Sequence, residues 1–160
     1  MTDSTTTTES TTTAIHGDRG DITIVREFDA PAELIFDCFF DPEHLSQFWG
    51  PTGVSTPLDR ITIDARPGGV FETVMVNDSD GEEYPTHGVF IEIERPTRWS
   101  WHETAMDLVS STQLVDLGNG RTLMTIRQTN APAAMLQGDA QAGFKTSLDK
   151  FAAHLASVQA

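Results

Sequence analysis

The stretch AAMLQGDAQAGFKTSLDKFAAHLASV, residues 133–158, decides the fold of this chain. Its apolar side chains Phe144, Leu148, Phe151 and Leu155 follow the spacing i, i+4, i+7, i+11, which is typical of an amphipathic helix with one buried side. A helix of about 25 residues measures about 37 Å, enough to cross a small domain. Its apolar side therefore needs a large partner, which the rest of the chain has to supply.

Most of the preceding chain has the period of β-strands. Residues 22–28 alternate apolar and polar side chains, as a half-buried strand does. Short turns separate six further segments, and the turn at residues 117–120, LGNG, is a strong hairpin signal. Strands joined by short turns pair antiparallel, so the sequence predicts an α+β fold with the helices on one face of a sheet. The six segments are residues 55–65, 70–76, 83–94, 99–104, 108–117 and 121–129.

Two short helices are expected after the first strand. Ala30-Pro31 and Asp41-Pro42 both favour a helix start, because proline in the first turn gives up no hydrogen bond and Asp41 can cap the helix. The sequence Trp49-Gly50-Pro51 should end the second helix, since neither glycine nor proline continues a helix easily.

The composition indicates one domain. The threonine-rich start, MTDSTTTTESTTTA, has almost nothing to bury, so residues 1–18 are predicted to form a disordered tail and residues 19–160 a single domain. This start lacks the basic and apolar regions of a secretory signal. No apolar run reaches the roughly 18 residues that a membrane span needs. Cys38 is the single cysteine, which fits a cytoplasmic location without disulfides.

The charge excludes one class of partner. The chain has 24 acidic and 10 basic residues and a net charge of −14. Such a surface repels phosphate backbones, so no nucleic-acid binding is expected.

The order of the motifs resembles a known superfamily. The run ITIVREFDAPAELIFDCFFDPEHLSQFWGP at residues 22–51 is similar to the opening of the SRPBCC (START-like, helix-grip, birch-pollen-allergen-like) superfamily. More narrowly, it resembles the branch homologous to the activator of the heat-shock-protein-90 ATPase. The matching features continue through DARPGGVFE at 64–72, THGVFIEIERPTRWSW at 86–101 and GNGRTLMTIRQ at 118–128. Phe144 stands where this branch usually has tryptophan. The resemblance covers about residues 21–156.

This resemblance implies a seven-stranded antiparallel sheet curved around the C-terminal helix, with a largely apolar cavity between them. Members of the superfamily bind lipids, hormones or polyketides, and some cyclise aromatic polyketides. The first expectation is thus a binding protein for a small hydrophobic molecule. The alternatives are a cyclase-, hydrolase- or isomerase-like enzyme using the same cavity, or an interaction protein that modulates a chaperone ATPase. The last role belongs to longer proteins with an additional domain. Whether the chain forms a homodimer stays open.

The residues expected to line the cavity are mostly aromatic. Core packing alone could account for each of them, because ligand pockets and cores are built from the same apolar residue types. The predicted lining set is Phe36, Phe40, Trp49, Phe71, Met75, His87, Ile91, Trp99, Trp101, Phe144, Leu148 and Phe151.

The direction of Trp99 and Trp101 depends on the turn before them. A three-residue turn at residues 95–97 points both tryptophans inward with Ile91 and Ile93, and the apolar pattern favours this register. A four-residue turn would instead point them outward and bring His102 in.

His87 is the one candidate for acid–base chemistry. It shares its parity with Ile91 and Ile93, so it is expected to point inward, where a neutral imidazole could orient a ligand or transfer a proton. The commoner role for such a histidine is a structural hydrogen bond at the rim of the sheet.

Two arginines are expected to have structural partners. Arg26 interrupts an apolar strand face and needs a carboxylate if it is buried. Asp64 could pair with either Arg66 or Arg26, and such a pair could alternatively hold a ligand carboxylate.

No metal, cofactor or nucleotide site is expected. The five histidines show no ligand spacing such as H-x-x-x-H, and Gly68-Gly69 lacks the context of a phosphate loop. Cys38 lies on the apolar side of its predicted helix, where a buried and unreactive thiol is expected.

Overall fold

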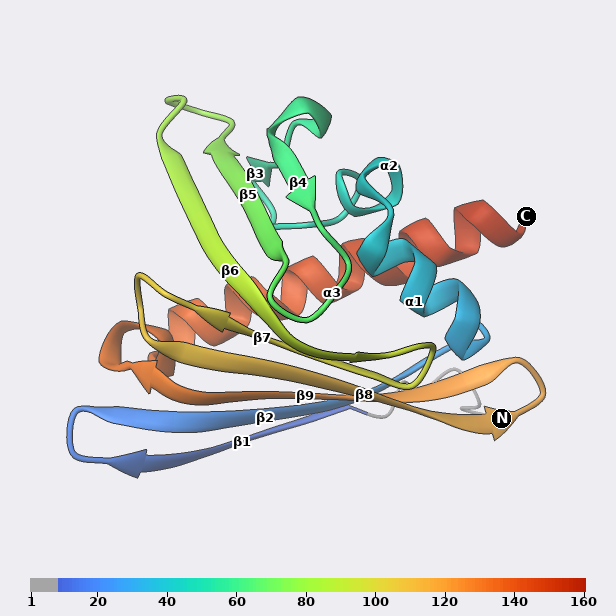
Figure 1. Ribbon diagram of the computed structural model, residues 1–160, viewed down its shortest axis with the longest axis horizontal. Helices are drawn as coiled ribbons and strands as arrows, with labels where there is room; N and C mark the ends of the chain where they lie inside the picture. The colour runs from blue at the N-terminus through green and yellow to red at the C-terminus, as the bar shows by residue number, and fades with distance from the viewer. Residues whose placement is uncertain (1–8) are drawn as a thin grey trace.

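The computed structural model describes residues 9–160, and these form one twisted antiparallel sheet against which a long helix packs (Figure 1). The sheet has nine strands in the order β1-β2-β9-β8-β7-β6-β5-β3, and β4 pairs with β5 outside this path. The strands are β1 (Glu9–His16), β2 (Arg19–Phe28), β3 (Val54–Ser55), β4 (Ile61–Ile63), β5 (Val70–Asn77), β6 (Glu83–Glu94), β7 (Arg98–Glu103), β8 (Leu108–Gly118) and β9 (Arg121–Pro132).

The helices lie on one face of this sheet, as predicted for an α+β fold (Figure 1). Helices α1 (Ala32–Phe40) and α2 (Pro42–Leu45) follow β2, and α3 (Gly138–Gln159) ends the chain. The side chain of Asp41 accepts a hydrogen bond from the backbone N–H of Glu43 and so caps α2, with Pro42 in its first turn. Two short 3-10 helices, η1 (Leu58–Arg60) and η2 (Ala133–Leu136), complete the set.

The sheet is larger than the seven strands expected, for two reasons. The predicted strand at residues 55–65 is split into β3, η1 and β4, because Pro57 has no N–H to offer a sheet. The other additional strand comes from the threonine-rich start.

The prediction that residues 1–18 form a disordered tail is wrong for residues 9–16. They form β1, an edge strand that pairs with β2 from Glu9 opposite Arg26 to His16 opposite Arg19. Nearly all of β1 is exposed, so it is held by backbone hydrogen bonds rather than by burial, and threonine suits such a strand. Residues 1–8 of the predicted tail lie outside the described residues.

A β-bulge in β6 changes which residues face the helix. Phe90 pairs with Trp101 and Glu92 with Ser100, so Ile91 has no opposite residue on β7. An extra residue reverses the in–out alternation beyond it. Phe90 therefore points inward and Ile91 is 50% exposed. The prediction that Ile91 lies on the inward face is wrong for this reason.

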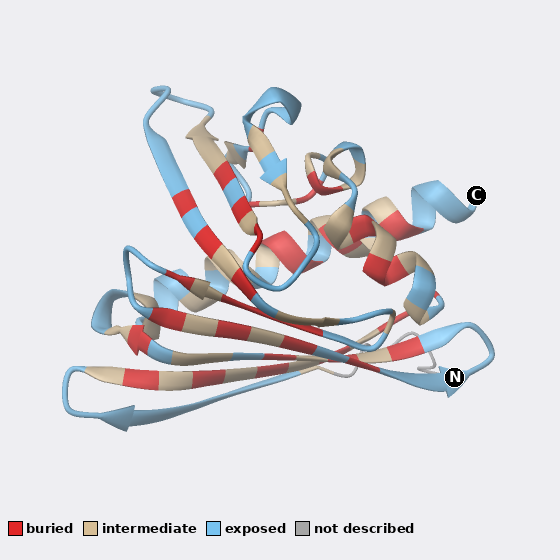
Figure 2. Ribbon diagram, in the orientation of Figure 1, coloured by how far each residue is buried: buried red, intermediate tan, exposed pale blue. Residues whose placement is uncertain are grey.

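Helix α3 confirms the apolar stripe but begins later than expected, at Gly138 rather than at residue 133. Leu148, Phe151 and Leu155 are buried, and Phe144 is half-buried. The ring of Phe151 lies 4.5–5.0 Å from the rings of Phe28, Phe39 and Phe48. The C-terminal half of α3 is thus held in a solid core, and Figure 2 shows buried positions alternating along the strands below it.

Arg26 has the carboxylate partners that its burial requires. Its side chain is 9% exposed, and Nη1 lies 2.8 Å from Asp149 Oδ1 on α3 and 3.2 Å from Glu9 Oε2 on β1. Asp64 pairs instead with Arg66, at 2.8 Å on the surface. Arg26 therefore links the edge strand, the sheet and the helix.

None of the helices formed by residues 9–160 combines the length and the apolar character needed to cross a membrane.

Candidate ligand-binding cavity

A cavity of about 400 Å³ lies between the sheet and the N-terminal half of α3. Its floor is made by inward-facing residues of β2 and β5–β9, and its roof by α1, the segment Phe48–Pro51, η2 and α3. This volume is within the range of small-molecule sites, which run from about 300 to 1,000 Å³.

Eight of the twelve residues predicted from the sequence line this cavity. They are Phe40, Trp49, Phe71, Met75, Trp99, Trp101, Phe144 and Leu148. Phe36 and Phe151 are buried in the core beside the cavity and do not line it. The other two, His87 and Ile91, point away from the helix.

The aromatic side chains form a connected wall. Trp99 packs at 5.3 Å from Phe39 and 5.4 Å from Phe40, and Trp101 at 5.0 Å from Phe71. Both tryptophans are buried, so the inward register predicted for them is confirmed. The Trp99–Phe40 contact is edge-to-face and the other two are tilted, arrangements that aromatic rings prefer over face-to-face stacking.

Gly88 makes room for this wall. A Cβ atom at this position would lie 2.7 Å from Trp101 Cε3 and 2.9 Å from the carbonyl oxygen of Phe71. The absence of a side chain at Gly88 therefore lets the Trp101 ring pack closely against the backbone of β6.

Three buried hydroxyl residues face the cavity, and the sequence-based prediction missed them. Thr86 lies on β6, and Ser110 and Thr112 lie on β8. Their side chains make no hydrogen bond to another described residue, whereas a buried hydroxyl that stabilises a fold normally has a hydrogen-bond partner. Ser110 pairs across the sheet with Gln128 of β9, whose amide also lines the cavity. The cavity thus offers hydrogen bonds on one side of an apolar space.

A signal for these residues is present in the sequence. Ser110 and Thr112 have the same parity as Leu108 and Leu114, which are buried on β8. Gln128 continues the inward parity of Met124 and Ile126 on β9. Polar residues at inward positions of a strand are informative because burying them without a partner costs free energy.

The cavity has almost no charge. Among the described residues that line it, Asp139 in the first turn of α3 is the single ionisable side chain, and it is exposed. No lysine, arginine, histidine or cysteine of residues 9–160 contributes to the lining.

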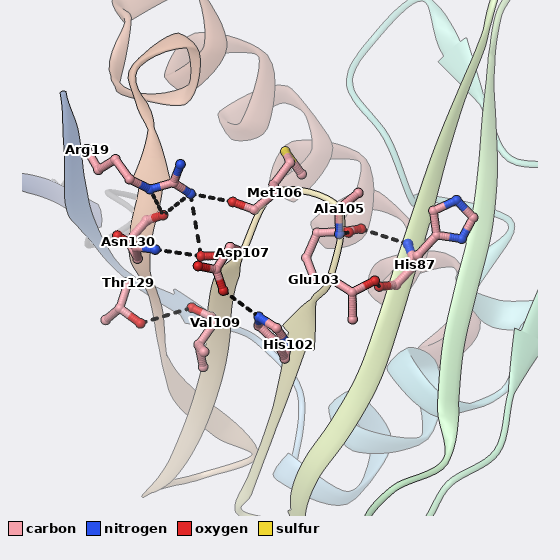
Figure 3. Close-up of polar contacts among 11 residues, drawn as sticks. Arg19, His87, His102, Glu103, Ala105, Met106, Asp107, Val109, Thr129 and Asn130 are labelled. Carbon is pink, nitrogen blue, oxygen red and sulfur yellow. Dashed lines mark hydrogen bonds and ion pairs between the residues drawn. The ribbon is translucent and has the colours of Figure 1, made fainter.

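His87 lies outside the cavity, contrary to its predicted inward position. Figure 3 shows its imidazole pointing away from Glu103. The side chain is 52% exposed, and Nδ1 is 3.9 Å from Glu72 on the neighbouring strand β5. The bulge at Ile91 lies between His87 and Ile93, so the two residues face opposite sides of the sheet although they have the same parity in the sequence.

Glu103 is a buried carboxylate with a structural role. Its two oxygens accept hydrogen bonds of 2.7 Å from the backbone N–H groups of His87 and Ala105 (Figure 3). These bonds hold β6, at His87, against the turn that follows β7. Both carboxylate oxygens are used within the fold, so Glu103 is not a free acid or base.

Comparisons with known proteins agree with this architecture. The family described as "Activator of Hsp90 ATPase homolog 1-like protein" matches residues 29–156. A comparison with curated proteins finds no match.

Several solved structures have the same fold. A protein from Rhodobacter sphaeroides is similar with a TM-score of 0.78 and 16% identity, over 92% of this chain and 99% of that one. A protein from Nitrosomonas europaea has a TM-score of 0.76 and 23% identity, over 91% of this chain and 99% of its own. The AHSA1 protein from Silicibacter pomeroyi has a TM-score of 0.68 and 26% identity, over 85% and 97% of the two chains.

The family match spans most of the chain, and the sheet, the two short helices and the long C-terminal helix follow in the order that the resemblance implied. This chain therefore belongs to the Activator of Hsp90 ATPase homolog 1-like family, a branch of the SRPBCC superfamily.

Proposed function

We propose that this protein binds a small, electrically neutral molecule with an apolar body in the cavity between the sheet and α3. The observation that carries this proposal is an aromatic-walled space of about 400 Å³ that is also lined by Thr86, Ser110 and Thr112, whose hydroxyls have no partner among the described residues. A core built only for stability would fill such a space with apolar side chains.

The charge of the lining supports a neutral ligand. A ligand carboxylate, phosphate or sulfonate would find no cationic side chain among the described lining residues. It would also enter a protein with a net charge of −14, past Asp139 at α3. Burying an unpaired charge is costly, so an anion should bind far more weakly than its neutral analogue.

The same lining favours binding over acid–base catalysis. A general acid or base must lie within hydrogen-bond reach of the reacting atom, and Asp139, at the exposed start of α3, is the single ionisable group among the described residues of the cavity wall. The family name refers to activation of the Hsp90 ATPase. We propose small-molecule binding instead because the side chains of this chain form a cavity.

Two fluorescent probes with the same ring system can test the proposal. N-phenyl-1-naphthylamine is neutral, and 1-anilinonaphthalene-8-sulfonate differs from it by one sulfonate. We expect the neutral probe to bind saturably at one site per chain and the sulfonate to bind at least about tenfold more weakly, which corresponds to about 1.4 kcal/mol. Fluorescence titration of both probes measures the difference.

A blocking variant makes the test specific to the cavity. Gly143 lines the cavity from α3, and a Cβ there would make an ordinary 3.5 Å contact with Pro51. Gly143→Leu should therefore keep the fold and lose the neutral probe. Thr125→Val on the opposite face of β9 is the matched control and should bind as the parent does. Equal binding of both probes, or unchanged binding in Gly143→Leu, would contradict the proposal.

A further inference from the structure

A second group of side chains, away from the cavity lining, brings a thiol and two imidazoles together. Cys38 comes from α1, His44 from α2 and His154 from α3, three helices that lie side by side (Figure 1). One ligand atom of each lies within 4.8 Å of the other two, and His44 Nδ1 is 2.9 Å from His154 Nε2. The three residues are far apart in sequence, so no spacing pattern could predict the group.

The distance between the two imidazoles indicates that they share one proton. At 2.9 Å one ring nitrogen donates and the other accepts, so a single proton lies between them. A metal ion can take the place of such a proton. In a tetrahedral zinc site, ligand atoms at bond lengths of about 2.0–2.3 Å are about 3.3–3.6 Å from one another. Small rotations of the side chains therefore suffice to reach that geometry.

The surroundings of the group suit a cation. Cys38 is fully buried, whereas His44 and His154 are partly exposed and leave a route from solvent. Burial, with Asp37 and Asp41 nearby, raises the pKa of the Cys38 thiol to about 12. A metal ion at Cys38 must therefore displace a tightly held proton, and the nearby carboxylates of Asp37 and Asp41 favour the cation that replaces it. Burial and the neighbouring His44 lower the pKa of His154, which keeps its imidazole in the neutral, metal-ligating form.

We propose that Cys38 Sγ, His44 Nδ1 and His154 Nε2 bind one divalent transition-metal ion of the zinc type, with water completing a tetrahedral site. One thiolate and two imidazoles are ligands that zinc and its spectroscopic substitute cobalt accept. On binding, the thiol proton is released to solvent. The proton shared by the imidazoles moves to the second ring nitrogen of its own histidine, so both imidazoles stay neutral and the metal takes its place between them. The ion would join α1, α2 and α3, and this site is independent of the ligand proposed for the cavity.

Cobalt titration of the full-length, untagged and reduced protein tests the site after removal of metals with a chelator. We expect a thiolate-to-cobalt charge-transfer absorption that saturates at one equivalent of Co²⁺ and is abolished by added Zn²⁺. Zn²⁺ should also raise Tm. Loss of partners around metal sites typically weakens affinity by about 10–100-fold, so Cys38→Ala and His154→Gln should each weaken Zn²⁺ affinity by at least about tenfold.

A surface histidine provides the control. His102 Nε2 lies 2.8 Å from Asp107 Oδ1 on the sheet, and His102→Gln should leave the cobalt spectrum unchanged. Absence of the thiolate absorption at one equivalent in the unmodified protein would overturn the proposal without any variant. Zn²⁺ affinity equal to that of the parent in Cys38→Ala or in His154→Gln would overturn it as well, since circular dichroism can establish that each variant is folded.

Discussion

At the scale of single residues, two buried threonines on neighbouring strands have different surroundings. Thr122 on β9 donates its hydroxyl hydrogen to the carbonyl oxygen of Ala30 at 2.7 Å. Thr112 on β8 faces the cavity and makes no hydrogen bond to another described residue. The first hydroxyl supports the fold, and the second is available to a ligand.

This difference predicts opposite effects of the same substitution. Thr122→Val should destabilise the protein by about 1–3 kcal/mol, because it leaves a buried carbonyl oxygen without its donor. Thr112→Val should leave the free energy of unfolding unchanged or raise it, because no hydrogen bond is lost. Urea denaturation of the two variants and the parent measures both effects. A similar loss of stability in Thr112→Val would mean that its hydroxyl has a structural role.

At the scale of elements, α3 has two halves with different tasks. Leu148 and the residues before it line the cavity, whereas Phe151 and Leu155 are buried in a solid core. Lys150 lies between these halves and donates from Nζ to the carbonyl oxygen of Val54 at 3.2 Å, and burial lowers its pKa. The helix is thus anchored at one end and leaves space at the other.

Truncation of the two phenylalanines of the stripe should separate these tasks. Phe151→Ala should cost about 3–5 kcal/mol, the usual effect of removing a fully buried aromatic ring. Phe144→Ala should cost less, because Phe144 is half-buried and borders a space that already exists. Chemical denaturation measures both. A loss for Phe151→Ala below about 0.5 kcal/mol, as at surface sites, would show that α3 is not held as described.

The same scale shows where sequence patterns are sufficient. The apolar stripe of α3 and the Asp41-Pro42 start of α2 are local features, and both were predictable. The bulge at Ile91 was not, because it is defined by which residues of β7 lie opposite β6. The sequence does not predict β1, because its residues have almost nothing to bury. An edge strand, however, needs only a partner for its backbone hydrogen bonds.

At the scale of the whole molecule, the site depends on contacts between distant segments. Helical and strand periods predicted most of the aromatic cavity wall, because bulky apolar residues at inward positions have few alternatives. The hydroxyls of Ser110 and Thr112 and the group of Cys38, His44 and His154 become recognisable only when strands and helices are placed together. Periodicity gives the direction of a side chain but not its neighbours.

The proposed function requires a cavity that accepts a ligand among its aromatic side chains. All three tryptophans of the chain, Trp49, Trp99 and Trp101, line this cavity. Their indole N–H groups are therefore reporters inside the site. At 17.5 kDa the protein is suited to two-dimensional nitrogen–proton NMR spectra, in which each indole gives a separate signal.

Titration of the nitrogen-labelled protein with N-phenyl-1-naphthylamine while these three signals are followed is the most direct measurement. We expect all three indole signals to move together and to stop moving at one equivalent of probe, and to stay in place when Gly143→Leu is titrated. Indole signals that do not move while amide signals of surface residues do would contradict the proposed function, because the probe would then bind outside the cavity.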